Sequence, residues 1–175
     1  PVRDDRQRSA EWRCAQFLSS PQLLPFAFVA GALFLSGGTA YLDQCTASGN
    51  VASTGNGGVV LVQYASLYVT GGLFGTNHAS VGGGAIALGE QASLDTSGAN
   101  FTANRATQAG GALWQQQTAS GSCSVSRVWF TGNVAATGGA ALLGSPQAVI
   151  GSPVPCSFTD TGFLSNSATQ FGGGE

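Results

Sequence analysis

One string of residues recurs along this chain, and it limits the fold more than any other feature. It occurs as FTANRATQAGGAL at 101–113, and close copies begin at residues 74, 130 and 163. Each copy starts with Phe, carries Asn three positions later and Ala five positions later, and then has a glycine pair. The four phenylalanines are Phe74, Phe101, Phe130 and Phe163. A motif repeated in register indicates a repeat architecture.

The two halves of the repeat differ in how much their lengths vary. From each Phe to the second glycine of its pair is 9 or 10 residues, whereas the spacing from that glycine to the next Phe grows through 16, 17, 19 and 24. A constant half and a growing half are typical of a solenoid whose insertions leave as loops from one side. Apolar runs are short and alternate with Gly, Asn, Ser and Thr, which favours strands over helices. We therefore predict an all-β, right-handed parallel β-helix of about five rungs, with three short strands in each rung.

Stacking of the rungs explains the residue types of the motif. Rungs repeat at about 4.8 Å, so each repeat residue lies over its counterpart in the next rung. Phe stacks on Phe inside the coil. Asn stacks on Asn at a bend, where its amide both donates and accepts and where its backbone tolerates a left-handed conformation. Glycine permits a turn that a Cβ would obstruct. The asparagines of this predicted structural ladder are Asn50, Asn77, Asn104, Asn133 and Asn166.

The motif F-x-x-N-x-A-x-x-x-G-G-A-[IL] is complete in FGTNHASVGGGAI and FTANRATQAGGAL, and it resembles the repeat of polymorphic outer-membrane proteins. The resemblance covers residues 45–175. The copy at 130 is one residue short before its glycine pair, and the copy around Asn50 has Ala47 in place of Phe. Members of that family are autotransporter-type surface proteins with repetitive β-helical passengers. The resemblance therefore implies surface display and adhesion.

A stretch without charged residues, SSPQLLPFAFVAGALFLSGGTAYL at 19–42, follows a short charged beginning. Its most apolar part, 23–35, is shorter than the about 20 residues of a membrane span and close in length to the apolar region of a signal peptide. A secretion signal or anchor and a cap over the first rung remain alternatives, since a solenoid needs its open end closed. We assign 1–36 to this head and 37–175 to the repeat domain. Because the chain begins with Pro and ends inside a repeat, we expect a fragment of a longer array.

Register along the repeat predicts which side chains meet between rungs. Cys123 and Cys156 each lie seven residues before a Phe, so we expect them to be adjacent, either as a disulfide in an oxidising compartment or as two buried thiols. Arg127 and Asp160 each lie three residues before a Phe, which predicts a cross-rung ion pair. No C-x-x-C pair occurs, so neither zinc nor another cofactor is expected.

The growing half of the repeat predicts the contact surface. Two loops leave from it, and their candidate contact residues are Gln115, Gln116, Gln117, Ser145 and Gln147. Their low charge suits hydrogen bonding to glycans or to a protein surface. The net charge of -2 gives no electrostatic reason to expect nucleic acid as a partner. Membrane contact is expected only through the head.

The predicted function is that of a structural and adhesive module, secreted or exposed on the cell surface (the outer membrane in a bacterium). Its expected partner is a protein or glycan of a host or neighbouring cell. The alternative is a portion of a polysaccharide-active enzyme with a pectin-lyase-like fold, where hydrolysis needs two carboxylates facing one cleft. Only Glu90 and Asp95 fall on one rung, so we expect no catalytic residues in this chain.

Overall fold

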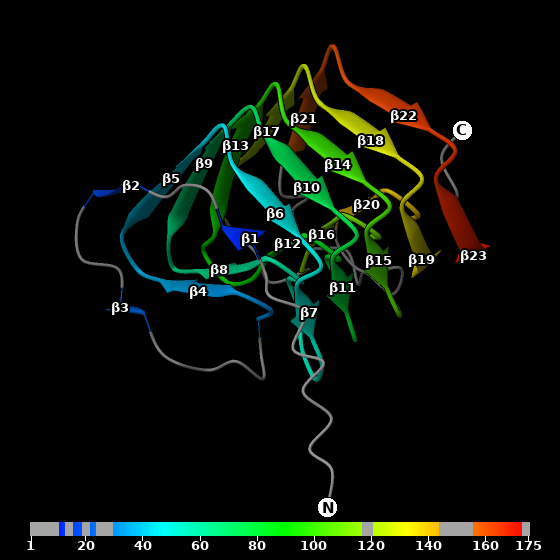
Figure 1. The fold of residues 1–175 in the computed structure, drawn as a ribbon, viewed down its shortest axis with the longest axis horizontal. Helices are drawn as coiled ribbons and strands as arrows, with labels where there is room; N and C mark the ends of the chain where they lie inside the picture. Colours follow the sequence, from blue (N-terminus) through cyan, green and yellow to red (C-terminus); the bar gives the residue numbers. More distant parts are fainter. Residues whose placement is uncertain are drawn as a thin grey trace, which may run out of the picture.

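The computed structural model describes residues 30–116, 121–143 and 156–172, together with three short strands nearer the amino terminus. Every regular element in this part of the chain is a β-strand. From β4 onwards the strands form a coil in which each rung passes through four sheets before the next rung begins (Figure 1). The described residues contain five such rungs.

The strands of the first rung are β4 (Leu33–Ser36), β5 (Thr39–Asp43), β6 (Thr46–Ser48) and β7 (Val51–Ala52). The second rung contains β8 (Val60–Gln63), β9 (Ser66–Thr70), β10 (Leu73–Gly75) and β11 (His78–Ala79). The third contains β12 (Ile86–Leu88), β13 (Ser93–Ser97), β14 (Asn100–Thr102) and β15 (Arg105–Ala106). The fourth contains β16 (Leu113–Gln115), β17 (Cys123–Ser126), β18 (Trp129–Thr131) and β19 (Val134–Thr137). The fifth contains β20 (Ala141–Leu143), β21 (Cys156–Thr159), β22 (Gly162–Leu164) and β23 (Ser167–Phe171).

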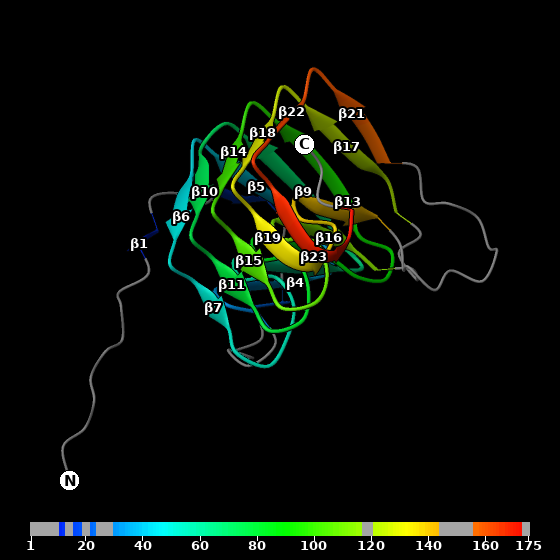
Figure 2. The same ribbon diagram turned by 90° about the vertical axis from the view of Figure 1, so that its right-hand side faces the viewer.

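Equivalent strands of successive rungs pair in parallel, so the molecule is the parallel β-helix that the repeat predicts. Each sheet is named here by its strand in the first rung: the β4, β5, β6 and β7 sheets. Figure 2 shows the four sheets enclosing one interior. Phe74 pairs in register with Phe101, and Phe101 with Phe130. The motif copies therefore lie directly over one another.

Each rung has four strands where the sequence predicted three, because the asparagine bend divides one side in two. In the second rung, Thr76 and Asn77 separate β10 from β11. The left-handed residue of this bend is Thr76, with φ of 53°, and not the asparagine. Ala103 and Ser165 adopt the same conformation before their asparagines. The asparagine side chain is thus selected for its hydrogen bonds and the residue before it carries the backbone turn.

The interior of the coil is filled by the phenylalanine stack and by aliphatic side chains. Phe74, Phe101 and Phe130 are buried, and their ring centroids are 5.0 and 5.2 Å apart. Phe163 continues the stack at 5.2 Å from Phe130 and is less buried, because no described rung lies beyond it. Ala47 pairs in register with Phe74 and so occupies the position of the missing first ring. No single rung could bury these rings alone, so stacking is what forms the core.

The first rung begins inside the segment that the sequence analysis assigned to the head. Leu33 and Leu35 of β4 are buried in the core, ahead of the boundary drawn at residue 37. Three strands precede it, β1 (Glu11–Trp12), β2 (Gln16–Leu18) and β3 (Gln22–Leu23), and they pair antiparallel with β6, β5 and β4. They occupy the outer edge of the first rung (Figure 1). No described segment forms a helix long and apolar enough to cross a membrane.

Candidate functional site

The outer surface of the β5 sheet is a regular array of polar side chains. Its strands alternate buried and solvent-facing residues, as in β9, where Leu67 and Val69 are buried and Ser66, Tyr68 and Thr70 face outwards. Because the strands pair in parallel register, outward residues form ranks that run from rung to rung. The middle rank contains Tyr41, Tyr68, Asp95, Ser124 and Ser157. The two ranks beside it contain Ser, Thr and a single Asp.

Two tyrosines of the middle rank stack on each other, and the stack then stops. The rings of Tyr41 and Tyr68 have centroids 4.9 Å apart and an interplanar angle of 11°. Both side chains are more than a third exposed. The next residue of the rank is Asp95, whose side chain is much shorter than a tyrosine. One aromatic face therefore ends beside a carboxylate.

A hollow of about 120 Å³ lies where the aromatic stack ends. The polar residues that line it are Ser66, Tyr68, Ser93, Asp95, Ser122 and Ser124. The inward-facing Leu67 and Leu94 complete the lining. Asp95 is its one charged residue. This is a small polar site with one aromatic wall.

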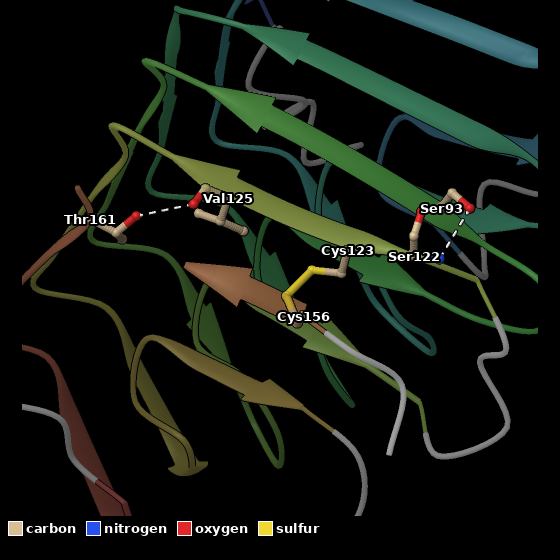
Figure 3. The surroundings of a disulfide bond; sticks show 6 residues. All are labelled: Ser93, Ser122, Cys123, Val125, Cys156 and Thr161. Carbon is tan, nitrogen blue, oxygen red and sulfur yellow. Dashed lines mark hydrogen bonds between the residues drawn. A yellow bond between two sulfur atoms is a disulfide. The ribbon is translucent and has the colours of Figure 1, made fainter. Parts of the chain in front are cut away.

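Most hydrogen-bonding groups around the hollow are available to a ligand. The backbone N–H of Ser122 donates to Ser93 Oγ over 3.3 Å (Figure 3). Within the described part of the chain, the side chains of Asp95 and Tyr68 have no hydrogen bond or ion pair with another residue. An exposed carboxylate without a protein partner can accept two hydroxyl donors.

Glu90 lies on the same rung as Asp95, but its carboxylate is already engaged. The hydroxyl of Tyr64, at the corner after β8, donates a hydrogen bond to Glu90 Oε2. This bond, with smaller effects of desolvation and of the Glu90 charge, raises the pKa of the Tyr64 phenol above its ordinary value of 10.0. Of the two carboxylates that the enzyme alternative would use, one is therefore bound to a phenol and the other faces the hollow.

A disulfide links the fourth and fifth rungs under the edge of this surface. Cys123 and Cys156 pair in register, their Cα atoms are 4.3 Å apart, and their sulfur atoms are bonded (Figure 3). Cys45, in the first rung, is also disulfide-bonded. The Cys123–Cys156 bond joins the two strands that follow the two longest insertions, so it fixes the end of the β5 sheet nearest to the predicted loops.

Gln115 cannot be a contact residue as predicted, because its side chain points into the coil. It is the last residue of β16, pairs in register with Leu88, and is only 1% exposed. Neither polar atom of its amide has a hydrogen-bond partner. Inward and outward residues alternate along β16, so this position faces inwards. The polar Gln115 was predicted from the sequence to lie in the loop that follows. Gln116 is partly exposed, whereas Gln117, Ser145 and Gln147 lie outside the described residues.

The predicted ion pair between Arg127 and Asp160 is also corrected. Both residues occupy the same corner of successive rungs and have positive φ, of 53° and 50°. The Arg127 guanidinium donates instead to Ser97 Oγ, 2.8 Å away on the preceding rung, and the described residues contain no ion pair between Arg127 and Asp160. A long flexible side chain at a corner can reach back as well as forwards. His78 and Arg105, which each follow an asparagine of the ladder, are neighbours in register.

Neither a metal site nor a known relative directs the assignment of function. The described residues contain no group of three or more His, Cys, Asp or Glu side chains that could hold a metal ion. The chain matches no protein-family model, no curated protein and no solved structure. The β5 sheet, with its exposed polar face and its hollow, is the candidate site in the described residues.

The tyrosines of this site were not predicted from the sequence, although a signal for them is present there. Tyr41, Tyr68 and Asp95 are spaced 27 residues apart, which is the distance from Phe74 to Phe101. The shared spacing places them in one rank. Only the alternation within β9 and β13 shows that this rank faces outwards, and short strands between variable loops make that alternation difficult to assign from sequence.

Proposed function

We propose that this chain is a structural and adhesive β-solenoid module that meets a protein or glycan of another cell surface through the outer face of its β5 sheet. The observation that carries the proposal is the uninterrupted polar face formed by ranks of Tyr, Asp, Ser and Thr over five rungs. Such a face offers many hydrogen-bonding groups on a rigid support and little charge. The insertions at 117–120 and 144–155 join this same sheet through β17 and β21.

Secretion or surface display is part of the proposal. Disulfides persist in oxidising compartments and are rare in the cytosol of most organisms. Cys123, Cys156 and Cys45 are all disulfide-bonded, which supports an extracellular place for the module. The resemblance of the repeat to that of polymorphic outer-membrane proteins supports the same location.

The test is binding of the full chain to intact cells and to a panel of immobilised glycans, with release of reducing sugar measured on the same glycans. We expect binding without release. In a matched variant, seven residues of 144–155 are deleted. The spacing from Gly139 to Phe163 then becomes 17 residues, as it is from Gly84 to Phe101. Reduced binding by this variant would assign part of the contact to that insertion. Absence of all binding would contradict adhesion, and sugar release would favour the enzyme alternative and direct mutagenesis to Glu90 and Asp95.

A further inference from the structure

We infer that the hollow beside Tyr68 binds one uncharged pyranose ring, which stacks on the Tyr68 ring and donates hydroxyl hydrogen bonds to Asp95. This inference rests on the proposed adhesive function and names the class of ligand for it. The hollow is then the part of the β5 sheet that selects among glycans. The surrounding ranks of Ser and Thr contact the remaining sugars of the oligosaccharide.

The position of the ring follows from the interrupted aromatic stack. Tyr41 covers one face of Tyr68 at 4.9 Å, and the opposite face of Tyr68 is directed along the rank towards Asp95. A flat ring in the next place of the stack would occupy the hollow of about 120 Å³. One water molecule needs roughly 10–15 Å³ of such space, so the hollow has room for a group much larger than water.

The chemistry of the wall selects a ring with one apolar face and a polar rim. The face of an aromatic ring carries partial negative charge, which attracts the C–H groups on the flat side of a pyranose. The rim of the hollow is formed by the hydroxyls of Ser66, Ser93 and Ser124 and by the Asp95 carboxylate. A carboxylate accepts hydrogen bonds that are stronger than those between neutral groups. An apolar wall with a few polar groups that fix orientation is the usual form of a small-ligand site.

Charge and hydrogen-bonding capacity exclude two other classes of ligand. Asp95 is the only charged residue lining the hollow, so a uronate carboxylate beside it would be repelled without a compensating cation. A quaternary ammonium ion would be attracted by Tyr68 and Asp95, but it has no acceptor for the serine hydroxyls and usually requires a cage of several aromatic rings. A neutral sugar both donates and accepts. It therefore uses the serines as well as the carboxylate.

The experiment is titration of the full chain with methyl galactoside and methyl glucoside, followed by saturation-transfer NMR and calorimetry. We expect a dissociation constant on the order of 1 mM for a single ring. The variant Tyr68→Ser should weaken binding at least tenfold. Serine occupies this rank in the fourth and fifth rungs, as Ser124 and Ser157, so the substitution suits the sheet. The control Trp129→Ser removes an aromatic side chain that is 55% exposed on the β6 sheet and should leave binding unchanged.

A second test uses an acidic sugar and the variant Asp95→Asn, so that the inference does not depend on the Tyr68 variant alone. Methyl galacturonoside differs from methyl galactoside in its carboxylate, and it should bind at least tenfold more weakly to the native chain. Asp95→Asn should reduce this discrimination, because the repelling charge is removed. Equal binding of methyl galactoside and methyl galacturonoside to the native chain would overturn the inference. Loss of binding in Trp129→Ser but not in Tyr68→Ser would also overturn it, as would binding of tetramethylammonium but of neither neutral sugar.

The outcomes separate this inference from the proposed function. If the Tyr68→Ser variant binds cells as well as the native chain does, the sugar site is contradicted and the proposed adhesive function stands. Binding of methyl galactoside by a chain that attaches to no cell or glycan polymer would retain the site and contradict adhesion.

Discussion

Five asparagine side chains form a continuous hydrogen-bonded column through the molecule, and each of the three central ones bonds to the rungs on both sides of its own. The backbone N–H and the Nδ2 amide of Asn77 both donate to Asn104 Oδ1, over 3.1 and 2.9 Å. Asn77 Nδ2 also donates to the carbonyl oxygen of Ala47, in the preceding rung. The same three bonds recur at Asn104 and at Asn133. The buried amides of the three central asparagines are therefore satisfied by one another and by backbone carbonyls, because an amide both donates and accepts.

Replacement of a central member of the column should be costly. In Asn104→Ala, Asn77 loses the acceptor of two donors and the carbonyl oxygen of Phe74 loses a donor. Each unsatisfied buried group costs about 1–3 kcal/mol, so we expect a loss of at least about 3 kcal/mol in the free energy of unfolding. Urea denaturation would measure it. The control is Asn100→Ala, because Asn100 is exposed on the β6 sheet and should tolerate the change. Equal denaturation midpoints for the two variants would refute this role of the column.

The Tyr64–Glu90 pair makes a prediction about pH. The pKa of Tyr64 is raised by its hydrogen bond to Glu90, so the stabilising effect of that bond is present below pH 10.0 and is lost as the pH rises through the raised pKa. An alkaline titration followed by phenolate absorbance should show the Tyr64 component ionising above pH 10.0. Tyr64→Phe should remove that component, and Glu90→Gln should lower its pKa. Asp95→Asn is the control. An unchanged titration in Glu90→Gln would contradict the assignment.

At the scale of the strand and its turn, the two glycines of the pairs at 57–58, 83–84 and 110–111 have different reasons to be glycine. Gly83 has a φ of 65°, which side chains disfavour, and a Cβ there would overlap the carbonyl oxygen of Ile86. Gly84 has no such backbone conformation. A Cβ on Gly84 would instead overlap the carbonyl oxygen of Gly111, in the next rung. The first glycine thus serves the turn within a rung, and the second allows two rungs to approach.

This distinction predicts opposite results for two glycine substitutions. Gly84→Ala should lower the free energy of unfolding by about 3 kcal/mol, because the overlap is with backbone atoms of the next rung. Gly75→Ala should be neutral or slightly stabilising, since its Cβ would lie 3.7 Å from the carbonyl oxygen of Thr102 and its φ is not positive. Thermal denaturation of both variants measures the difference. A similar loss in both would mean that strand propensity, and not contact between rungs, explains the glycine.

The elements also show what the sequence could and could not predict. Register followed from counting residues, because parallel stacking places Phe on Phe and Cys on Cys at fixed offsets. The number of strands per rung did not follow, since the left-handed residue Thr76 carries no signal that distinguishes a bend from a strand. The orientation of Gln115 was missed for a related reason. A polar residue next to an insertion was interpreted as part of the loop, whereas the alternation of β16 continues through it.

At the scale of the whole molecule, stability is distributed along the coil. Each rung contacts only the rungs next to it, so local changes should affect neighbouring rungs more than distant ones. The fifth rung has fewer neighbours among the described residues, and its Phe163 is less buried than the other rings of the stack. The Cys123–Cys156 disulfide joins this rung to the fourth across a separation of 33 residues. It therefore holds the rung that follows the longest insertion.

Removal of this disulfide should loosen one end of the coil. In the chain-entropy account, a loop of this length contributes about 3–4 kcal/mol. The double variant Cys123→Ser, Cys156→Ser avoids leaving one unpaired thiol in either strand. Hydrogen exchange should accelerate in the β20, β21, β22 and β23 strands of the variant, while amides of the second and third rungs retain their protection, because solenoids open locally.

The matched control for this variant is a double replacement at Ser124 and Ser157, which occupy the same two strands and are also neighbours in register. Their side chains face outwards and form no covalent bond, so replacing both by Ala should leave exchange in the fifth rung unchanged. Faster exchange throughout all rungs of the cysteine variant would show that the coil unfolds as one unit. No acceleration in the fifth rung would show that stacking alone, through Phe130 and Phe163, is sufficient to hold it.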